Sequence, residues 1–401
     1  MVLAGWNRAN RMSPSLRNGA DMLCEKFSSD RCHSCQWLAL PYPQQLERKQ
    51  AQLKTLFANS GADFFPPVVS AETRFRNKAK MVVLGTVDHP VLGIVNRHGV
   101  ATDLSDCPLY PAVFQPLFVA IKGFIKQARL TPYNVSKKRG ELKFVLLQYS
   151  QAENAFMLRF VLRSTEQIER IRQHLPELLA AQPSLKVVSV NLQPVHMAVL
   201  EGDEEVLLTE AGALTEVLND VPLHIRPGGF FQTNTDIASK LYRTAAEWAS
   251  QSSAKNLVDL FCGAGGFGLH CLQSGQKLLG LEISPESIAA AQGSAEQMGC
   301  ADRVQFQVMD LQQGLPTLPA DFAHPDQVLV NPPRRGLGLA VCDWLRQVAP
   351  NQILYSSCNA ESMADDIGQL PGYRLRRLQL FDMFPHTAHY EVLGLLQREP
   401  A

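Results

Sequence analysis

The chain has 401 residues, which is enough for two or three domains, and no apolar run in it is long enough to span a bilayer. Its composition, 46% hydrophobic and 19% charged, is that of an ordinary globular protein rather than a disordered or fibrous one. Lysine and arginine number 38, as do aspartate and glutamate, so a nucleic-acid partner needs a local basic surface because no overall positive field attracts it.

The N-terminal region divides into two parts. Residues 1–21 are polar, have no periodicity and contain no hydrophobic core of a secretion signal, so we expect a disordered extension of a cytoplasmic protein. Residues 22–57 form a second segment, in which the run CEKFSSDRCHSCQW precedes a predicted helix from Pro43 to Phe57. In a reducing compartment, cysteines indicate metal binding, catalysis or packing rather than disulfides.

The cysteines near the N-terminus are candidate metal ligands. Cys24, Cys32 and Cys35 are closely spaced, and Cys107 follows in DLSDCPLY. Four thiolates suit zinc and an iron–sulfur cluster about equally, so the spacing alone leaves both open. Four other cysteines are expected to be packing residues, namely Cys262, Cys271, Cys300 and Cys342.

Residues 58–235 are predicted to form a β-rich α+β domain. Strands are expected at KMVVLGTV, HPVLGIVNR, LKFVLLQYS, AFMLRFVLR and LKVVSVNLQ, with a helix at ERIRQHLPELLAAQ and a hairpin between the third and fourth strands. The run KKRGELK (137–143) is a candidate RNA contact. In RFRNKAKM, four cations alternate with other residues, so on a strand they share one face, which suits RNA or a solvated edge strand. These cations are Arg74, Arg76, Lys78 and Lys80.

From residue 236 to the C-terminus, strands and helices alternate. The predicted helix DIASKLYRTAAEWASQ precedes strands at NLVDLF, KLLGLEI, VQFQVMD, QVLVNPP, QILYSSCN and YEVLGLLQ, and the helix SPESIAAAQGSAEQMG lies between two of them. This alternation predicts a doubly wound, Rossmann-like α/β domain with a mainly parallel sheet. Ligands of such sheets bind beyond the carboxyl ends of the strands, so functional residues are expected there.

The strand NLVDLF runs into a glycine-rich turn, DLFCGAGGFG. Glycines let the backbone approach a ligand and bring the N-terminus of the next helix toward it. Glu282, near the end of the following strand, can accept hydrogen bonds from ribose hydroxyls. A nicotinamide or flavin site is the alternative, but the turn lacks the GxGxxG register and Asp259 would repel a pyrophosphate. An acidic group suits the amino end of S-adenosyl-L-methionine, so a methyl-donor site is favoured.

Two later strand ends carry polar side chains. QVLVNPPRRG places Asn331 at one of them, and ILYSSCN places Cys358 at the next. A lone cysteine is most often a buried packing residue. Cys358, however, stands between polar residues at a strand end, which favours a functional thiol.

Five motifs together resemble those of the RNA uracil-C5 methyltransferase family: FFQTN (230–234), DLFCGAGGFG, NPPRRG, SSCN and FPHTAHYE (384–391). The resemblance covers nearly the whole chain from Cys24. It implies a catalytic domain dependent on S-adenosyl-L-methionine over residues 236–401 and an RNA-binding role for residues 58–235. The lack of room for an N-terminal TRAM domain before Cys24 favours the branch of the family that methylates 23S ribosomal RNA.

The resemblance also implies roles for single residues. Cys358 matches the family's nucleophile, and Glu391 matches the proposed base that removes the C5 proton. The family often has aspartate where this chain has Asn331, so an amide contact is expected there. The positions matching those that hold S-adenosyl-L-methionine are Gln232, Phe261, Glu282 and Asn331. The thiols implied to hold a [4Fe-4S] cluster in segment 22–57 and beyond are Cys24, Cys32, Cys35 and Cys107.

The chemistry explains why these residue types are needed. C5 of uracil is a poor nucleophile, and addition of a thiolate to C6 raises the electron density at C5. We expect Arg334 to favour the thiolate. The target uridine is expected in a single-stranded loop, where unstacking a base costs least. The phenylalanines of FFQTN are candidates to stack on bases, although Phe231 equally suits the core.

Three alternatives remain at this point. An amino-methyltransferase uses NPP followed by an aromatic residue, whereas Arg334 follows here and SSCN would have no role. A transfer RNA uracil methyltransferase has the same chemistry and another substrate. A non-catalytic, metal-stapled RNA-binding protein would not need both Cys358 and Glu391. No feature indicates an obligate protein partner or a membrane partner.

Overall fold

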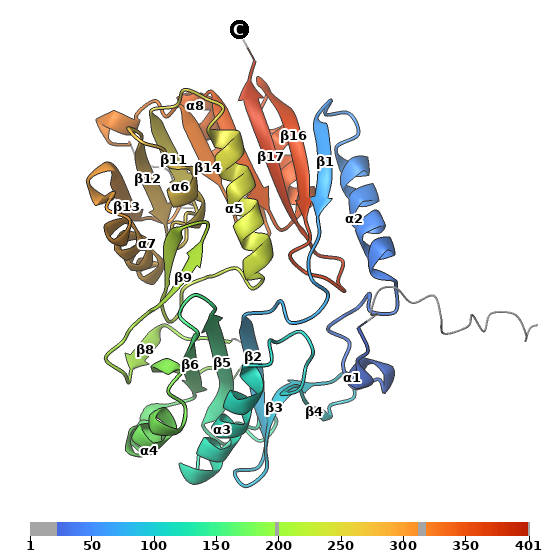
Figure 1. Cartoon of the computed structure of the whole chain (residues 1–401), viewed down its shortest axis with the longest axis vertical. Coiled ribbons are helices and arrows are strands. Elements are labelled where there is room, and N and C mark those ends of the chain that lie inside the picture. Colours follow the sequence, from blue (N-terminus) through green and yellow to red (C-terminus); the bar gives the residue numbers. More distant parts are fainter. Residues whose placement is uncertain (1–21, 197–199, 312–317, 400–401) are drawn as a thin grey trace, which may run out of the picture.

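Two β-sheets organise the part of the chain that the computed structural model describes, residues 22–196, 200–311 and 318–399. The larger sheet lies above the smaller one in Figure 1, and helices pack on both. The expected extension over residues 1–21 lies outside the described residues. Among the described helices, none is long and apolar enough to cross a membrane.

The larger sheet has eight strands, and all except β17 run in the same direction. β17 is antiparallel to both of its neighbours, so it forms a hairpin with β16 beside an otherwise parallel sheet. The predicted doubly wound α/β fold is confirmed. In spatial order the strands are β1 (Asp63–Val68), β16 (Tyr373–Phe381), β17 (Glu391–Arg398), β15 (Gln352–Ser357), β14 (Gln327–Val330), β11 (Asn256–Leu260), β12 (Lys277–Glu282) and β13 (Val304–Val308).

Helices cover both faces of this sheet. Apolar side chains of α5, α6 and α7 form the core on one face, and those of α2, α8 and α9 form the core on the other. In Figure 1, α5 crosses in front of the sheet. The helices are α2 (Tyr42–Leu56), α5 (Thr235–Ala249), α6 (Gly266–Cys271), α7 (Pro285–Gln297), α8 (Leu339–Val348) and α9 (Ala360–Gly368).

The smaller sheet has seven strands in the order β4-β3-β2-β5-β6-β7-β8. Its pairs are antiparallel except β6 with β7, which are parallel and joined through α4 (Ile168–Ala181). The predicted hairpin of β5 and β6 is confirmed. Together with α3 (Phe114–Gln127), α4 packs on one face and forms a third core. The strands are β2 (Lys78–Gly85), β3 (Pro90–Val95), β4 (Ala101–Asp103), β5 (Leu142–Ser150), β6 (Ala155–Leu162), β7 (Leu185–Leu192) and β8 (Glu204–Leu207).

Smaller elements connect and flank the two sheets. The hairpin of β9 (Leu214–Leu218) and β10 (Val221–Ile225) packs against α7 and leads into the FFQTN motif. The short helix α1 (Glu25–Ser28) lies at the side of the smaller sheet (Figure 1). Single 3-10 turns occur at Thr165–Gln167, Ala301–Arg303 and Ala320–Phe322.

Two parts of the chain lie elsewhere than the sequence suggested. Residues 63–68, expected in the central domain, form β1 and extend the larger sheet beside β16, and α2 packs on that sheet too. An exposed edge strand can pair with strands of other molecules. β1 covers the edge that β16 would otherwise expose. In RFRNKAKM the strand begins only at Lys78: Arg74 has a left-handed φ of 57°, and Arg76 forms an isolated bridge with Asn234. The prediction of four cations on one strand face is therefore wrong for Arg74 and Arg76.

Candidate active site

Three of the four predicted donor-site residues, Phe261, Glu282 and Asn331, lie in one row at the carboxyl edge of the larger sheet, whereas Gln232 lies outside this sheet, in the segment between β10 and α5. β11 pairs with β12 on one side and β14 on the other, so the strand order reverses here. Extending the register of each pair by one residue aligns Phe261 with Glu282 and with Asn331. The same extension places Ser356 of β15 beside Asn331. This point of reversal is where open α/β sheets bind their ligands.

The glycine-rich turn after β11 has the backbone shape that a ligand cradle needs. Gly263 and Gly265 have φ values of 53° and 81°, and a side chain at Gly263 would meet open space. Phe261 has φ 61°, which is strained for a bulky residue, and such strain concentrates at functional sites. At Gly268 a β-carbon would lie 2.9 Å from Asp259 Oδ2, so only glycine fits without a shift.

Two acidic residues flank this turn: Asp259 is buried and Glu282 is half-buried. Asp259 Oδ2 accepts a hydrogen bond from the Gly268 amide at 2.9 Å, whereas its Oδ1 has no partner among the described residues. Burial raises the pKa of Asp259 to about 8. Glu282 accepts hydrogen bonds from the amides of Gly263 (3.1 Å) and Ser284 (3.0 Å), so its carboxylate faces the turn. Of the two, only Glu282 is partly exposed, whereas Asp259 is buried behind the turn.

Cys358 and Glu391 converge because β15 and β17 are antiparallel. Ser357 pairs with Val392, and one further residue of this register sets Cys358 opposite Glu391. Glu391 is buried, and its Oε1 accepts a hydrogen bond from Ser356 Oγ at 2.6 Å. Cys358 is half-buried, so its thiol remains open to a substrate. A thiol and a carboxylate thus share one face of this strand pair.

The electrostatics of this pair favour neutral groups in the free protein. Burial raises the pKa of Glu391 to about 7, and the hydrogen bond from Ser356 opposes that shift. Burial, followed by the charge of Glu391, also raises the pKa of Cys358, while Arg334 lowers it. The expected thiolate-favouring effect of Arg334 is therefore present but smaller than the effect of burial. A carboxyl group with a pKa near 7 suits proton transfer at neutral pH.

Asn359 connects the two motif turns. Its Nδ2 donates to the carbonyl of Arg334 at 2.9 Å, and its Oδ1 accepts from the amide of Glu361, which begins α9. Ser357 Oγ accepts a hydrogen bond from the amide of Asn359 at 3.0 Å, which closes the turn. The NPPRRG and SSCN turns are thereby fixed relative to each other.

The FFQTN segment crosses from β10 to α5 and is held by a residue that sequence reasoning missed. The Asn77 side chain donates to the Gln232 carbonyl (2.9 Å) and to Thr235 Oγ1 (2.7 Å), and the Asn77 amide donates to the Thr233 carbonyl (2.9 Å). Gln232 itself is buried. The only sequence signal of Asn77 was its place within the basic run.

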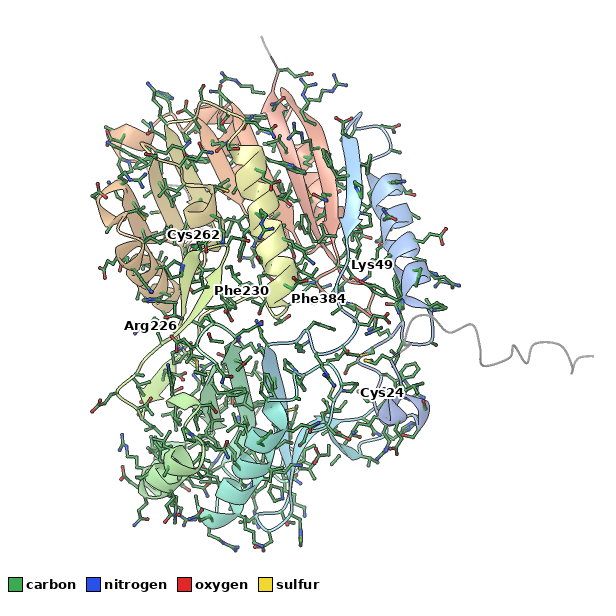
Figure 2. All side chains as sticks on the ribbon, in the orientation of Figure 1. Cys24, Lys49, Arg226, Phe230, Cys262 and Phe384 are labelled. Atoms are coloured by element: carbon green, nitrogen blue, oxygen red, sulfur yellow. The ribbon has the colours of Figure 1, made fainter. Side chains whose placement is uncertain are left out.

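The two phenylalanines of FFQTN have different environments. Phe231 is buried in the core beside α5, whereas Phe230 is 64% exposed. Figure 2 places Phe230 between the two sheets. Phe230 is therefore the one that can meet a base.

The two histidines of FPHTAHYE differ in the same way. His386 is buried, and its Nε2 lies 2.8 Å from the carbonyl of Glu72, which can only accept, so this nitrogen carries the proton. His389 is exposed overall. The part of its ring that is buried, together with the charge of Arg334, still lowers its pKa. His386 is thus held within the fold, whereas Glu391 lies opposite Cys358 in the register of β15 and β17.

Tyr242 of α5 lies against the glycine-rich turn and within electrostatic reach of Glu391. It is buried, and a β-carbon at Gly266 would lie 2.7 Å from its hydroxyl. Burial, with Glu391 and then Asp259, raises the pKa of Tyr242. Neither Tyr242 nor Ser356 was identified from sequence, because each acquires its role from a neighbour distant along the chain.

The four N-terminal candidate ligands gather at the side of the smaller sheet but do not form a closed ligand shell. Burial, then Cys107, Cys32 and Cys24, raise the pKa of Cys35 to about 12, so the four thiols lie within electrostatic reach of one another. In residues 22–196, 200–311 and 318–399, no three His, Cys, Asp or Glu side chains stand close enough to hold a metal ion. All nine cysteines are free thiols, and the four predicted packing cysteines are buried.

Polar contacts attach this cysteine segment to the smaller sheet. Asp30 binds Arg97 at 2.6 Å, and the Thr102 hydroxyl donates to the carbonyl of Arg31 at 3.0 Å. Lys26 contacts Asp106 in the loop that carries Cys107. The segment is thus fastened to β4 and its surroundings by the chain's own side chains.

The candidate RNA-contact residues are distributed differently from the expectation. Arg76 lies beside the cysteines, where its charge acts on both Cys35 and Cys107. Lys143 of the second basic run is buried and donates to the carbonyl of Gln193 at 2.7 Å, so it is not available to RNA. The exposed cations of these runs and of NPPRRG are Arg74, Lys80, Lys137, Lys138, Arg139, Arg334 and Arg335.

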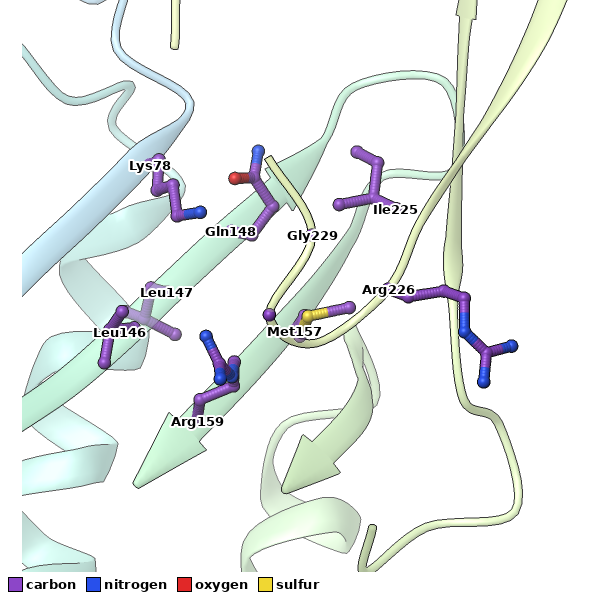
Figure 3. Close-up of a pocket in the computed structure, with 10 residues that line it drawn as sticks. Lys78, Leu146, Leu147, Gln148, Met157, Arg159, Ile225, Arg226 and Gly229 are labelled. Atoms are coloured by element: carbon purple, nitrogen blue, oxygen red, sulfur yellow. The ribbon is translucent and has the colours of Figure 1, made fainter. Parts of the chain in front are cut away.

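A small cavity lies between the smaller sheet and the loop that leads into FFQTN. Figure 3 shows Lys78 and Arg159 on the sheet, with Arg226 and Gly229 on the loop. Burial, then the charge of Lys80, lowers the pKa of Lys78 to about 8. Arg159, in contrast, is paired with Glu201 and Glu205.

The fold and site define a class: a doubly wound α/β transferase with a donor turn at the point of strand reversal and a thiol–carboxylate pair beside it. A family model described as tRNA (Uracil-5-)-methyltransferase matches residues 317–399, and one described as RNA cap guanine-N2 methyltransferase matches residues 254–344. The chain is 54% identical over 379 residues to the 23S rRNA (uracil(747)-C(5))-methyltransferase RlmC of Escherichia coli O127:H6 (strain E2348/69 / EPEC), covering 94% of this chain and 100% of that protein. The RlmC of Escherichia coli O7:K1 (strain IAI39 / ExPEC) gives the same values.

One solved structure is similar along most of the chain. It is the Pyrococcus abyssi tRNA (uracil-54, C5)-methyltransferase in complex with S-adenosyl-L-homocysteine, with a TM-score of 0.75 and 25% identity, covering 90% of this chain and 85% of that one. The chain therefore belongs to the RNA uracil-C5 methyltransferase family, as its motifs predicted, and is dependent on S-adenosyl-L-methionine.

Proposed function

We propose that this protein methylates C5 of a uridine in 23S ribosomal RNA, at the position corresponding to uracil 747 of its 54% identical relatives. The observation that carries the proposal is the convergence of Cys358 and Glu391 on one face of β15 and β17. A nucleophile and a base in one place are what C5 methylation of uracil requires.

The donor site is proposed to be formed by Gln232, Phe261, Glu282 and Asn331. The support is the position of Phe261, Glu282 and Asn331 at the strand reversal and the open space above Gly263. S-adenosyl-L-methionine, when bound there, supplies an electrophilic methyl group. Glu282 is suited to the ribose hydroxyls, and Asn331, at the adjoining strand end, offers an amide rather than a carboxylate.

Cys358 and Glu391 carry the steps on the RNA. The Cys358 thiolate forms a bond to C6 of uracil, and the electron pair of the C5–C6 double bond moves into an enolate. C5 of this adduct takes the methyl group as the methyl–sulfur bond of the donor breaks, and the donor leaves as a neutral thioether. Glu391 then removes the C5 proton, the C5–C6 double bond forms again, and the bond between C6 and sulfur breaks to release Cys358. Burial keeps the pKa of Glu391 near 7, so it can accept this proton at neutral pH.

A [4Fe-4S] cluster held by Cys24, Cys32, Cys35 and Cys107 forms part of the proposal. Its support is the chemistry of the donor set, four thiols that lie within electrostatic reach of one another. Such a cluster would need the segment to close further around it than the described residues do. When bound, it would staple segment 22–57 to the loop at Cys107, and we assign it no step of the reaction.

RNA is proposed to contact exposed aromatic and cationic side chains near the FFQTN and NPPRRG motifs and on β2. Exposed Phe230 is suited to stack on an unpaired base, and Arg334 and Lys80 to meet phosphates. A uridine in a single-stranded loop costs least to unstack, so it is the expected target. A cytoplasmic location is proposed together with this substrate, and free cysteines are typical of a reducing compartment.

The test is to map 5-methyluridine at nucleotide resolution in 23S and transfer RNA from cells that carry the wild-type gene, a deletion or single variants. We expect the deletion and Cys358→Ala to lose the modification at position 747, while transfer RNA is unchanged. The matched control is Cys300→Ser, because this buried thiol only donates to the carbonyl of Ala295. Loss of 5-methyluridine from transfer RNA instead would reassign the substrate, and no loss anywhere would indicate a non-catalytic RNA-binding protein.

A further inference from the structure

The base at position 391 directly follows a loop whose conformation depends on another part of the chain. Residues 382–390 join β16 to β17, and Phe381 pairs with Glu391 where the two strands meet the loop. We call residues 382–390 the base loop. Its backbone path determines where β17 begins and therefore how Glu391 faces Cys358.

Helix α2 presents a polar stripe to the base loop. Tyr42, Gln45 and Lys49 are spaced three and four residues apart, so they lie on one face of the helix, and all three are buried. An amphipathic helix normally buries apolar residues on such a face. Leu53, one turn further on, does so in the core beside α8 and α9.

Each polar residue of the stripe binds the base loop. Lys49 Nζ donates to Asp382 Oδ1 at 2.6 Å and to the carbonyl of Phe384 at 3.1 Å. Tyr42 donates its hydroxyl proton to Asp382 Oδ2 at 2.6 Å, and Gln45 Oε1 accepts from the amide of His386 at 2.8 Å. Figure 2 shows Lys49 and Phe384 lying close to each other beside α2. Alternate residues of the loop, 382, 384 and 386, are thus held from one helix.

Stability of the fold does not by itself explain the buried Lys49–Asp382 ion pair. Both side chains are fully buried, and burial lowers the pKa of Lys49 against the opposing effect of Asp382. Removing two charges from water costs about as much as, or more than, their attraction returns, by several kcal/mol per ion. An apolar pair of similar volume would stabilise the fold equally well. What a buried ion pair adds is one defined geometry.

The same helix reaches the donor side of the site. Tyr42 Oη accepts a hydrogen bond from the Ser70 amide at 3.0 Å, and Ser70 Oγ accepts one from Asn234 Nδ2 at 2.8 Å. Asn234 belongs to FFQTN and begins α5 by accepting from the Ile237 amide. Tyr42 therefore stands between the base loop and the segment that carries Gln232.

We propose that Lys49 and Tyr42 are positioning residues that act through Asp382 to hold the base loop, so that Glu391 can remove the C5 proton. The inference rests on the proposed function of Cys358 and Glu391. It assigns to α2 a role in the elimination half of the reaction, after methyl transfer. Loosening the loop should slow proton removal more than it slows addition of Cys358 or binding of the donor.

The decisive variant is Lys49→Met with Asp382→Asn, which removes both charges together and leaves no buried charge unpaired. Purified full-length protein is given a 23S RNA fragment and S-adenosyl-L-methionine labelled in the methyl group. We measure donor affinity, turnover, and the fraction of protein in a denaturant-resistant adduct that carries the label. We expect donor affinity within about twofold of wild type, turnover at least about tenfold lower and a larger labelled adduct fraction.

A matched control separates positioning from stability. Leu53→Ala lies on the same helix and removes a buried side chain outside the polar stripe, at a cost of about 2–5 kcal/mol. It should lower the melting temperature without raising the adduct fraction. If the double variant does not fold, Tyr42→Phe removes a single hydroxyl and should raise the adduct fraction in the same direction by a smaller factor.

The outcomes distinguish this inference from the proposed function. If wild-type protein forms no 5-methyluridine in any RNA, the proposed function fails. If wild type is active, the adduct fractions of the double variant and of Tyr42→Phe are the decisive quantities. The positioning role of α2 is overturned if both fractions equal that of wild type. That role is overturned equally if activity falls only in proportion to the folded fraction, as with Leu53→Ala.

Discussion

Ser356 Oγ donates a hydrogen bond of 2.6 Å to Glu391 Oε1 from the neighbouring antiparallel strand, and both side chains are buried. This bond opposes the effect of burial on the Glu391 pKa. It links the strand that ends in Cys358 to the strand that begins with Glu391. Its removal should therefore alter the chemistry of the base more than the fold.

Ser356→Ala is expected to raise the pKa of Glu391 above its value of about 7. The base works as a carboxylate, so activity falls as pH falls through this pKa, and the acidic limb of kcat/KM should move to higher pH by about half a unit or more. The measurement is tritium release from C5-labelled RNA between pH 6 and 9. Ser357→Ala is the control, because Ser357 binds the Asn359 backbone and not Glu391. Superimposable profiles for Ser356→Ala and wild type would contradict this role.

Glu391→Gln should stop the reaction after methyl transfer. Addition of Cys358 and transfer of the methyl group remain, whereas the C5 proton cannot leave, so a covalent protein–RNA adduct carrying the labelled methyl group should accumulate. Denaturing gel electrophoresis detects it, and adding Cys358→Ala should abolish it. Normal turnover of Glu391→Gln, or a folded and donor-bound variant without adduct, would point to another base, with exposed His389 as the next candidate.

The same substitution should stabilise the protein at alkaline pH. Burial raises the folded-state pKa of Glu391 from 4.5 to about 7, so its contribution to stability is complete below the unfolded pKa and is lost as pH rises through 7. Glutamine stays neutral. Each pKa unit corresponds to about 1.4 kcal/mol, so Glu391→Gln should melt several degrees above wild type at pH 8 and close to it at pH 4. Calorimetry at both pH values checks this, and an equal difference at both would refute it.

Asn77→Ala should weaken binding of S-adenosyl-L-methionine, although Asn77 is not one of the proposed donor-binding residues. It removes side-chain hydrogen bonds to the Gln232 carbonyl and to Thr235 Oγ1, each worth about 1 kcal/mol. Isothermal titration should show an affinity for S-adenosyl-L-methionine about tenfold lower. Thr235→Val loses only the second bond and should have a smaller effect. An unchanged affinity in Asn77→Ala would show that Gln232 does not depend on this support.

Protein purified without oxygen should be brown and contain about four irons per chain, as four thiolates around a [4Fe-4S] cluster predict. Iron and zinc are measured by mass spectrometry on wild type, Cys107→Ser and Cys300→Ser. We expect Cys107→Ser to lose the iron and Cys300→Ser to keep it, because Cys300 is a buried packing residue far along the chain from the cluster. Stoichiometric zinc without iron in wild type would reject the cluster.

The sequence by itself determined the elements whose signal is local. The glycine turn between Phe261 and Gly268 could be identified because glycine adopts positive φ at little cost, as at Gly263 and Gly265, and allows the close approach seen at Gly268. Six of the eight strands of the catalytic sheet were evident as apolar runs, whereas β1 and β16 were not predicted. The alternation of strands with helices predicted a mainly parallel arrangement. Cys358 was distinguished from the packing cysteines because polar residues surround it at a strand end.

Only the tertiary structure decided which distant segments meet. β1 and α2 join the larger sheet, and β17 runs antiparallel beside β15, so Glu391 reaches Ser356 and Cys358. Lys49 meets Asp382 across 333 positions of sequence, and neither residue stands out in its own neighbourhood. Local periodicity tells which side of an element is buried, but strand order and register follow from burial and hydrogen bonding summed over the whole chain. The contacts between α2 and the base loop belong to that sum, and for this reason no local motif predicts them.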